Sequence, residues 1–423
     1  MYSKLNSTVI ERLSNKFGDA FYILDSSRFV QNYLELINSF RSIYPNTNIA
    51  YSYKTNYIPE LCALIYTHGG YAEVVSDMEY TLAKRVGVPD SSIYFNGPYK
   101  KEAFLEKVLL AGAHVNLDSL AEVRMVLALA QRYTNHNFYV GLRCNFDIGT
   151  KTSRFGLDCE GDEFLTTLAW FNNVPNIHIA GLHCHFPNRD LQSFRARTEK
   201  MTALLKNTDF PELQYISFGG GYLGKIPPEL AQSMNVPPAT YAQYAEVIAG
   251  AMRKHFNDSQ EVQLIIEPGS ALVADTMSLV ARVVSTKTVR GRYIATLAAS
   301  SFNVNPSVKG VQRPIEVFSP KITPQNINNI HQENVHSWDI VGYTCIEDDI
   351  LYKGYEGSLR EGDIVIFHNV GSYSVVCKPP FILPNIPIVD IGIYSEQIMK
   401  RAESFDDIFS TYTFSGKTYE VRI

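Results

Sequence analysis

The sequence has few cysteines, no long apolar run and only a small excess of negative charge. Its six cysteines among 423 residues never occur in C-x-x-C spacing, so neither a disulfide framework nor a zinc site is expected. No apolar run is long enough to span a membrane, and residues 1–6 lack the apolar core of a signal peptide. We therefore expect a cytoplasmic protein with reduced thiols and without membrane contact.

The charge balance and the composition indicate which kinds of molecule the protein can bind. A net charge of −5 and a pI near 6.1 give no field that would gather nucleic acid or an anionic membrane. The composition, 45% hydrophobic and 19% charged, is that of a globular protein with a large core. We expect a small molecule or a second subunit as the partner, and the length predicts two domains.

Eight apolar segments of strand length follow one another between helical patterns. They cover residues 48–54, 72–76, 93–97, 114–118, 138–145, 179–185, 215–221 and 263–269. Eight strands that alternate with helices are typical of a (β/α)8 TIM barrel, which is an α/β fold. In such barrels the catalytic groups lie at the carboxyl ends of the strands.

After the eighth segment the pattern changes to strands alone. Further strands are expected at residues 279–284, 293–299, 339–345, 363–369 and 373–377, between turns rich in Gly, Pro and Asn. A short strand at 21–24 precedes the barrel and is expected to join them. We therefore predict a barrel domain over residues 25–275 and a β-sheet domain formed by residues 1–24 and 276–423.

The lysine that ends the first barrel strand is the first candidate for catalysis. Lys54 follows the largely apolar and aromatic run 48–53, whose rings would limit the hydration of its ammonium group. Such a lysine loses its proton more easily and can attack a carbonyl carbon to form a Schiff base. The alternative is an ordinary lysine at a strand end that faces water, and this stretch alone favours that alternative.

Two other strand ends carry groups suited to a bound cofactor. Gly219, Gly220 and Gly221 have no side chains to block an anion, and they follow the seventh strand, a usual phosphate position in barrels. Glu267 ends the apolar eighth strand, where a protonated ring nitrogen or an internal arginine would pair with it.

Histidines and a cysteine supply further candidates. His183 and His185 project to the same side of a strand, but no other ligands stand at recognisable spacing, so we predict no metal site. One imidazole would stack on a planar cofactor, and the other would be a hydrogen-bonded core residue.

Cys345 lies in an acidic loop with Asp348 and Asp349, which would hold an amino group while the thiol transfers a proton. A small buried thiol is the alternative.

Together these motifs resemble those of the fold-type III pyridoxal-phosphate-dependent decarboxylases, which have an alanine-racemase-like barrel. The group holds diaminopimelate, ornithine, arginine and carboxynorspermidine decarboxylases. The similar segments are Y-S-Y-K-T-N at 51–56, G-L-H-C-H at 181–185, G-G-G at 219–221, E-P-G at 267–269, C-I-E-D-D at 345–349 and G-S-Y at 371–373. They occur in the order found in the family, and the resemblance runs from about residue 18 to residue 390.

The resemblance implies pyridoxal 5'-phosphate as the cofactor and a role for each residue around it. Lys54 would carry the cofactor as a Schiff base, and His185 would stack on its ring. Glu267 would pair with the pyridine nitrogen and keep it protonated. The glycines 219–221 and Tyr373 would contact the phosphate.

The resemblance also implies a homodimer and an amino-acid substrate that loses its α-carboxylate. Cys345 with Asp349 matches a motif that reaches into the neighbouring subunit's site, which makes Cys345 the proton donor to Cα. Asp348 or Asp349 would bind a distal amine of the substrate. Arg313, followed by Pro314, resembles an arginine that binds a distal carboxylate in diaminopimelate decarboxylases.

Departures from the family pattern concern the substrate. Ser270 replaces the arginine of E-P-G-R, Val317 replaces a tyrosine, and Ile346 replaces the glutamate after the cysteine. Asn188 stands where a serine would help to hold the phosphate. These changes favour a basic amino acid or an amino-acid conjugate over diaminopimelate. The long loop at 222–241 is expected to form a lid or part of the substrate pocket.

Two other functions remain open at this point. An amino-acid racemase on the same fold would need a base on each face of the substrate, and the racemases use a tyrosine from the second domain where this chain has Cys345. A catalytically inactive, decarboxylase-like regulator would bind partners without the cofactor, which the presence of Lys54, Glu267 and Cys345 disfavours.

Overall fold

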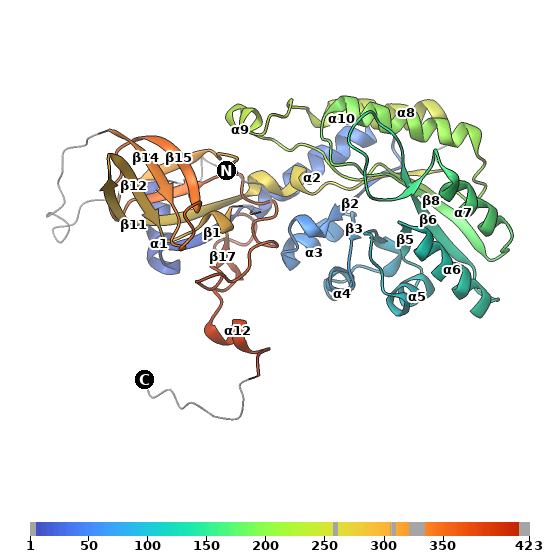
Figure 1. Ribbon diagram of the computed structural model, residues 1–423, viewed down its shortest axis with the longest axis horizontal. Helices are drawn as coiled ribbons and strands as arrows, with labels where there is room; N and C mark the ends of the chain where they lie inside the picture. Colours follow the sequence, from blue (N-terminus) through green and yellow to red (C-terminus); the bar gives the residue numbers. More distant parts are fainter. Residues whose placement is uncertain (1–5, 257–260, 305, 307–309, 321–334, 414–423) are drawn as a thin grey trace. The chain divides into compact units, whose positions relative to one another are not determined.

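The computed structural model describes residues 6–256, 261–304, 306, 310–320 and 335–413. The chain forms two compact units (Figure 1). The barrel unit contains Asp25–Met277 and Asn369–Val376, and the β unit contains Met1–Leu24, Ser278–His368 and Cys377–Ile423. Among the described helices, none is long and apolar enough to cross a bilayer.

Eight parallel strands close into a ring in the barrel unit, which confirms the predicted TIM barrel. They are β2 (Thr47–Ser52), β3 (Tyr71–Val74), β4 (Ile93–Phe95), β5 (His114–Leu117), β6 (Phe138–Asn145), β8 (Ile177–His183), β9 (Tyr215–Ser217) and β10 (Gln263–Ile266). They pair in the order β5-β4-β3-β2-β10-β9-β8-β6, and the pairing of β5 with β6 completes the ring. All but β6 end earlier than predicted, because the chain turns there into loops.

Helices follow the strands around the outside of the ring (Figure 1). They are α2 (Ser26–Arg41), α3 (Pro59–Thr67), α4 (Asp77–Arg85), α5 (Glu102–Leu110), α6 (Leu120–Arg132), α7 (Asp162–Asn172), α8 (Leu191–Asn207), α9 (Pro228–Ser233), α10 (Tyr241–Phe256) and α11 (Ser270–Val273). Side chains of Asp25, Ser76, Ser119 and Asp190 each accept a backbone N–H of the first helical turn. The long loop at 222–241 contains α9.

A tyrosine from β9 fills the middle of the barrel. Tyr215 is buried, packs edge-on against Tyr94 with 5.0 Å between ring centroids, and donates a hydrogen bond to Asn116 at 2.8 Å. The neighbouring strands make room with glycine, since a Cβ on Gly181 would lie 2.0 Å from the tyrosine ring. The closed ring therefore depends on a small residue opposite a large one.

In the part of the β unit that the structure describes, a sheet is accompanied by two α-helices. Its elements are α1 (Ser7–Phe17), β1 (Ala20–Leu24), β11 (Met277–Val289), β12 (Arg292–Leu297), β13 (Ile315–Phe318), β14 (His336–Val341), β15 (Ile350–Gly357), β16 (Ile364–Phe367), β17 (Ile388–Asp390), β18 (Ile398–Lys400) and α12 (Phe405–Phe409). The early strand β1 pairs with β17, as Tyr22 lies opposite Ile388. The strand predicted to end at Cys345 ends at Val341, so the cysteine lies in the loop before β15.

One predicted strand of the β domain is wrong. Residues 373–377 form turns, and the segment Asn369–Val376 belongs to the barrel unit. Two hydrogen bonds explain this: Asn56 Nδ2 donates to the Gly371 carbonyl at 2.9 Å, and Tyr373 N–H donates to the Thr55 carbonyl at 2.9 Å. The late G-S-Y segment thus lies beside the residues that follow β2.

Candidate active site

A cavity opens at the carboxyl ends of the barrel strands, with a volume of about 230 Å³. Residues from four strand ends and from the late turn line it: Ser52, Lys54, Thr55, His185, Pro187, Arg189, Gly220, Gly221, Tyr222, Glu267, Gly269, Ser270 and Tyr373. Six residues that the sequence marks as candidates for the cofactor are therefore in one place. Gly219 adjoins the cavity through Gly220.

Lys54 forms an ion pair in the short 3-10 turn that follows β2. Its ammonium contacts the carboxylate of Glu73 on β3, which also accepts a hydrogen bond from Ser52 Oγ at 2.6 Å. Burial lowers the pKa of Lys54, but the charges of Glu73 and Glu267 outweigh it and hold that pKa above its usual value. The sequence-based expectation of a readily deprotonated lysine is therefore wrong for this arrangement, and Lys54 needs a proton acceptor before it can attack.

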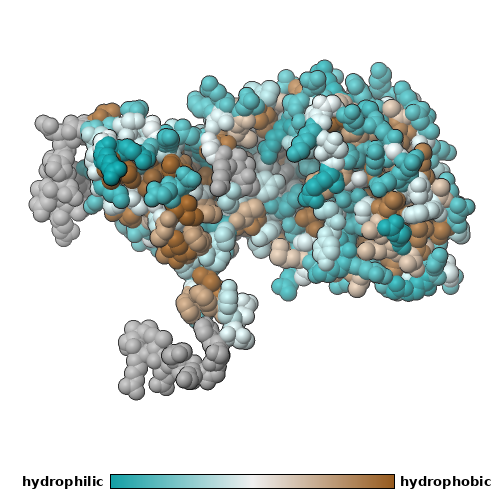
Figure 2. Space-filling view, viewed as in Figure 1, coloured by the Kyte–Doolittle hydropathy of each residue, from teal (hydrophilic) through white to brown (hydrophobic). Residues whose placement is uncertain are grey.

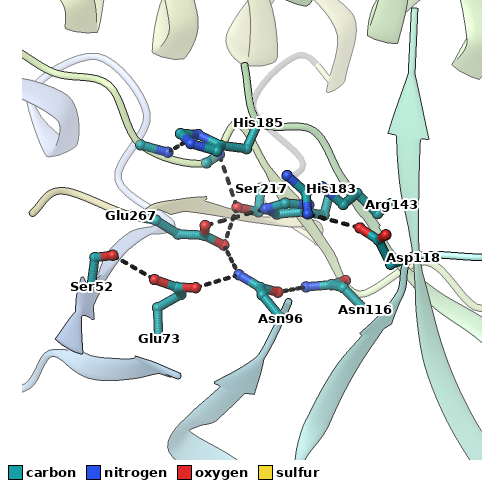
Figure 3. A network of polar contacts seen from close by, with 12 residues as sticks. Ser52, Glu73, Asn96, Asn116, Asp118, Arg143, His183, His185, Ser217 and Glu267 are labelled. Carbon is teal, nitrogen blue, oxygen red and sulfur yellow. Dashed lines mark hydrogen bonds and ion pairs between the residues drawn. The ribbon is translucent and has the colours of Figure 1, made fainter. Parts of the chain in front are cut away.

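A polar network joins the two carboxylates of the site (Figure 3). Asn96 Nδ2 donates at 3.1 Å both to Glu73 Oε1 and to Glu267 Oε1. The orientation of this amide is fixed, because Asn96 Oδ1 accepts a hydrogen bond from Asn116 at 2.7 Å. One amide therefore holds two buried carboxyl groups side by side.

Glu267 is a buried carboxylate with hydrogen bonds to both oxygens. Besides Asn96, Ser217 Oγ donates to Oε1 at 2.8 Å and His183 Nε2 lies 3.2 Å from Oε2. Burial alone would raise the pKa of Glu267, but His183, Lys54 and Ser217 together lower it below its usual value. The group is an anion whose neighbours include no arginine among the described ion pairs, so the arginine alternative is not supported.

His185 presents a neutral ring to the cavity. The Gly220 N–H donates to its Nδ1 at 3.0 Å, which fixes Nδ1 as an acceptor. Burial and the nearby cation Lys54 lower the pKa of His185 well below its usual value. The two histidines have different surroundings: His183 is a core residue bonded to Glu267, and His185 is a flat neutral surface.

The glycine loop after β9 fits a phosphate group. A Cβ on Gly219 would lie 2.6 Å from His185 Cβ, and one on Gly220 would lie 2.6 Å from the Glu267 carbonyl oxygen. Only glycine therefore allows the backbone to lie this close to the cavity wall. With Lys54, the flat ring of His185 and the anion Glu267 on one cavity, the donor set suits a phosphorylated pyridine with an aldehyde.

The other predicted residues belong to the β unit, and none is among the residues that line this cavity. Cys345 and Asp348 are exposed in the loop between β14 and β15. Asp349 is buried, and its two oxygens accept hydrogen bonds from Ser301 and Thr344 at 2.7 Å each. Asp349 thus organises the loop that carries the cysteine.

Arg313 is also buried in the β unit, and burial lowers its pKa to about 10. Sequence reasoning missed Glu73 and Ser217 in the barrel unit. A signal was available, because each is a polar residue in an otherwise apolar strand, as expected for a side chain that points into the barrel.

Comparisons with known proteins agree with this geometry. Residues 31–274 match the family model "Pyridoxal-dependent decarboxylase, pyridoxal binding domain". The chain is 28% identical to a probable chloroplastic diaminopimelate decarboxylase of Oryza sativa subsp. japonica, over 92% of this chain and 78% of the relative. It is 23% identical to diaminopimelate decarboxylase of Aquifex aeolicus, over 94% of this chain and 93% of the relative.

A solved structure shows the same fold. The crystal structure of diaminopimelate decarboxylase from Helicobacter pylori complexed with L-lysine superposes with a TM-score of 0.80 at 20% identity, covering 95% of this chain and 98% of that one. The family match covers more than half of the sequence and includes every barrel strand. The chain therefore belongs to the pyridoxal-dependent decarboxylases, carboxy-lyases whose cofactor is pyridoxal phosphate.

Proposed function

We propose that the protein decarboxylates an α-amino acid that carries a second amino group, with diaminopimelate as the first candidate. The relatives named above are diaminopimelate decarboxylases, which favours that substrate. Ser270, Val317 and Ile346 favour the second candidate, a basic amino acid such as lysine or an amino-acid conjugate, because Ser270 leaves the cavity wall without a guanidinium at that position. The observation that carries the reaction type is the buried, ionised Glu267.

Four features of the cavity would hold the cofactor. Lys54 is the amine that would attach it covalently, and the glycine loop with Tyr373 would receive its phosphate. His185 would lie flat against its ring. Glu267, as an anion, would keep a proton on the ring nitrogen. When bound, the protonated ring supplies a sink for the electron pair released as the bond between Cα and the carboxylate breaks.

Glu73 has a defined task in this proposal. Lys54 is protonated in the ion pair and must lose a proton before it can attack the aldehyde. Glu73 touches the ammonium group and is the acceptor that the geometry supplies. Ser52 Oγ donates to the same oxygen at 2.6 Å and stabilises the carboxylate in position.

A second copy of the chain would complete the site. Cys345 is the proposed proton donor to Cα, and the exposed Asp348 is better placed than the internally bonded Asp349 to hold a substrate amine. Large apolar side chains are exposed beside this loop: Ile346, Phe381, Ile382 and Leu383. Tyr343 Oη donates to the Phe381 carbonyl at 3.5 Å, so the two segments are neighbours. Apolar side chains gather on the visible face of the β unit (Figure 2), as at a face covered by a partner.

The test is a product assay in heavy water. The purified chain with pyridoxal phosphate is incubated with diaminopimelate isomers, lysine, ornithine and arginine, and product masses are recorded. Loss of carbon dioxide with gain of one deuteron is expected for one of them, and Lys54→Ala should abolish it while the exposed Lys101→Ala does not. Deuterium gain without loss of carbon dioxide, or turnover by Lys54→Ala at the wild-type rate, contradicts the proposal.

A further inference from the structure

An arginine lies fully buried behind the glycine loop. Arg197 on α8 has no exposed surface, although long charged side chains are rarely buried. Its guanidinium donates to the carbonyls of Phe186, Asn188 and Gly220 at 3.2, 2.5 and 3.3 Å and to Ser193 Oγ at 2.9 Å. The side chain thus ties the loop after β8 to the loop after β9.

Both of these loops form walls of the cavity. Pro187 and Arg189 of the first loop and Gly220 and Gly221 of the second line it. Arg197 donates to the carbonyl of Gly220, and Gly220 itself lines the cavity. Only the backbone of the glycine loop therefore separates this charge from the cavity. The two loops are therefore joined through a buried cation.

The charge of Arg197 has no carboxylate partner. None of the ion pairs among the described residues includes it, and its guanidinium lies over the ring of Phe194, 4.0 Å from the centroid. Asp190 is close enough to act on its pKa, but burial dominates and lowers that pKa. Arginine stays protonated in proteins, so a buried positive charge persists here. Carbonyl dipoles offset only part of the cost of burying it.

A doubly charged anion in the cavity would offset the remaining cost of burying the Arg197 charge. The wall next to the glycine loop carries the neutral Ser270 and the half-buried Arg189, so the buried guanidinium is one of two arginine charges on that side. In a region screened from water, a charge acts on an anion over several ångströms.

We propose that Arg197 is a positioning residue that makes the site selective for the phosphorylated cofactor. It acts through its charge on the phosphate and through its hydrogen bonds on the loop that receives the phosphate. This inference depends on the placement of the phosphate at the glycine loop in the proposed function.

The experiment compares the affinities for pyridoxal phosphate and for pyridoxal, which lacks the phosphate. Binding to the cofactor-free protein is followed by the visible absorbance of the Schiff base between the ligand and Lys54. The Lys54→Ala variant cannot form this Schiff base and serves as the blank. Arg197→Met, which removes the charge, should weaken binding of pyridoxal phosphate about tenfold and change binding of pyridoxal about twofold or less. Arg197→Lys, which keeps the charge but cannot reach both loops, should weaken the binding of both ligands by the same factor of about two or less.

Two further variants make the result decisive. Arg195→Met removes an exposed arginine from the same helix and should change neither affinity. If Arg197→Met does not fold, Arg197→Gln removes the charge while retaining an amide donor. Equal weakening of both ligands in a variant without charge, or no weakening, overturns the inference. Absence of a Lys54-dependent absorbance in the wild-type protein would instead overturn the proposed function.

Discussion

The ion pair between Lys54 and Glu73 controls the proton that the attacking amine must lose. Glu73 raises the pKa of Lys54, so Glu73→Gln should lower that pKa. A lower pKa increases the fraction of free amine at each pH below it. The rate at which the protein captures pyridoxal phosphate should then reach half of its maximum at a lower pH than in the wild-type protein.

Stopped-flow absorbance across a pH series measures this shift. The exposed Glu229→Gln on α9 serves as the control and should leave the profile in place. If the pH profile of Glu73→Gln coincides with that of the wild-type protein, a group other than Glu73 controls the pKa of Lys54.

Glu79 on α4 gives the protein a pH-dependent stability. Its side chain is buried and accepts a hydrogen bond from the Val75 N–H at 2.8 Å, and burial raises its pKa to about 7. A raised pKa means that the folded state binds the proton more tightly than the unfolded state. The contribution of Glu79 to stability is therefore present at low pH and is lost as the pH rises towards 7.

Glu79→Gln imitates the protonated acid at every pH. The free energy of unfolding of the variant minus that of the wild-type protein should be larger at pH 8 than at pH 5, by about 2–3 kcal/mol. Chemical unfolding of both proteins at the two pH values measures this. A stability difference that is the same at pH 5 and at pH 8 would contradict the raised pKa of Glu79.

Individual site residues differ in how far the sequence predicts them. Lys54, His185 and Glu267 stand at strand ends within short contiguous motifs, and the resemblance of those motifs to the family's selects them. Their partners are not visible in the same way. Asn96 reaches Glu267 across 171 sequence positions, and Ser217 reaches it across 50. Such pairs exist only once the barrel has closed, because closure brings the strand ends together.

At the scale of elements, two glycines should respond oppositely to a methyl group. Gly181 on β8 faces Tyr215, and a Cβ there would lie 2.0 Å from the ring, so Gly181→Ala should cost about 1–3 kcal/mol or prevent folding. Gly250 on α10 has only Glu246 Oε1 within reach, at 4.0 Å, so Gly250→Ala should stabilise by about 0.4–1 kcal/mol.

Thermal unfolding of both variants tests the pair. A third variant identifies the cause, since Gly181→Ala combined with Tyr215→Ala removes the clash and should cost less than the two single changes added together. Strict additivity would mean that the tyrosine ring does not occupy the space next to Gly181.

Element identity was readable from the sequence more reliably than element ends. The eight barrel strands are apolar runs of the right length, and all eight form. The sequence predicts a strand at 373–377 because most of these residues are apolar, yet Tyr373 has φ of 61°, a left-handed conformation that no strand adopts. That conformation follows from the hydrogen bond to Thr55, which sequence periodicity does not contain.

At the scale of the whole molecule, the change from alternating elements to strands alone predicts that the chain has two parts. It does not predict that Asn369–Val376 returns to the barrel unit. The hydrogen bond responsible joins Asn56 to Gly371 over 315 sequence positions. Long-range pairs of this kind leave no local pattern, so a boundary near residue 276 was the limit of what the sequence could supply.

The last prediction concerns the assembly of two chains. If Cys345 serves the site of a neighbouring chain, Lys54→Ala and Cys345→Ala chains are each inactive at their own sites but complement one another. After mixing and exchange, half of the dimers are hybrids with one intact site out of two. About one quarter of the wild-type activity should therefore return. As a control, Lys54→Ala mixed with a chain that carries both changes forms no intact site and should stay inactive. Hybrids that form by mass measurement yet recover no activity would place Cys345 outside the neighbouring site.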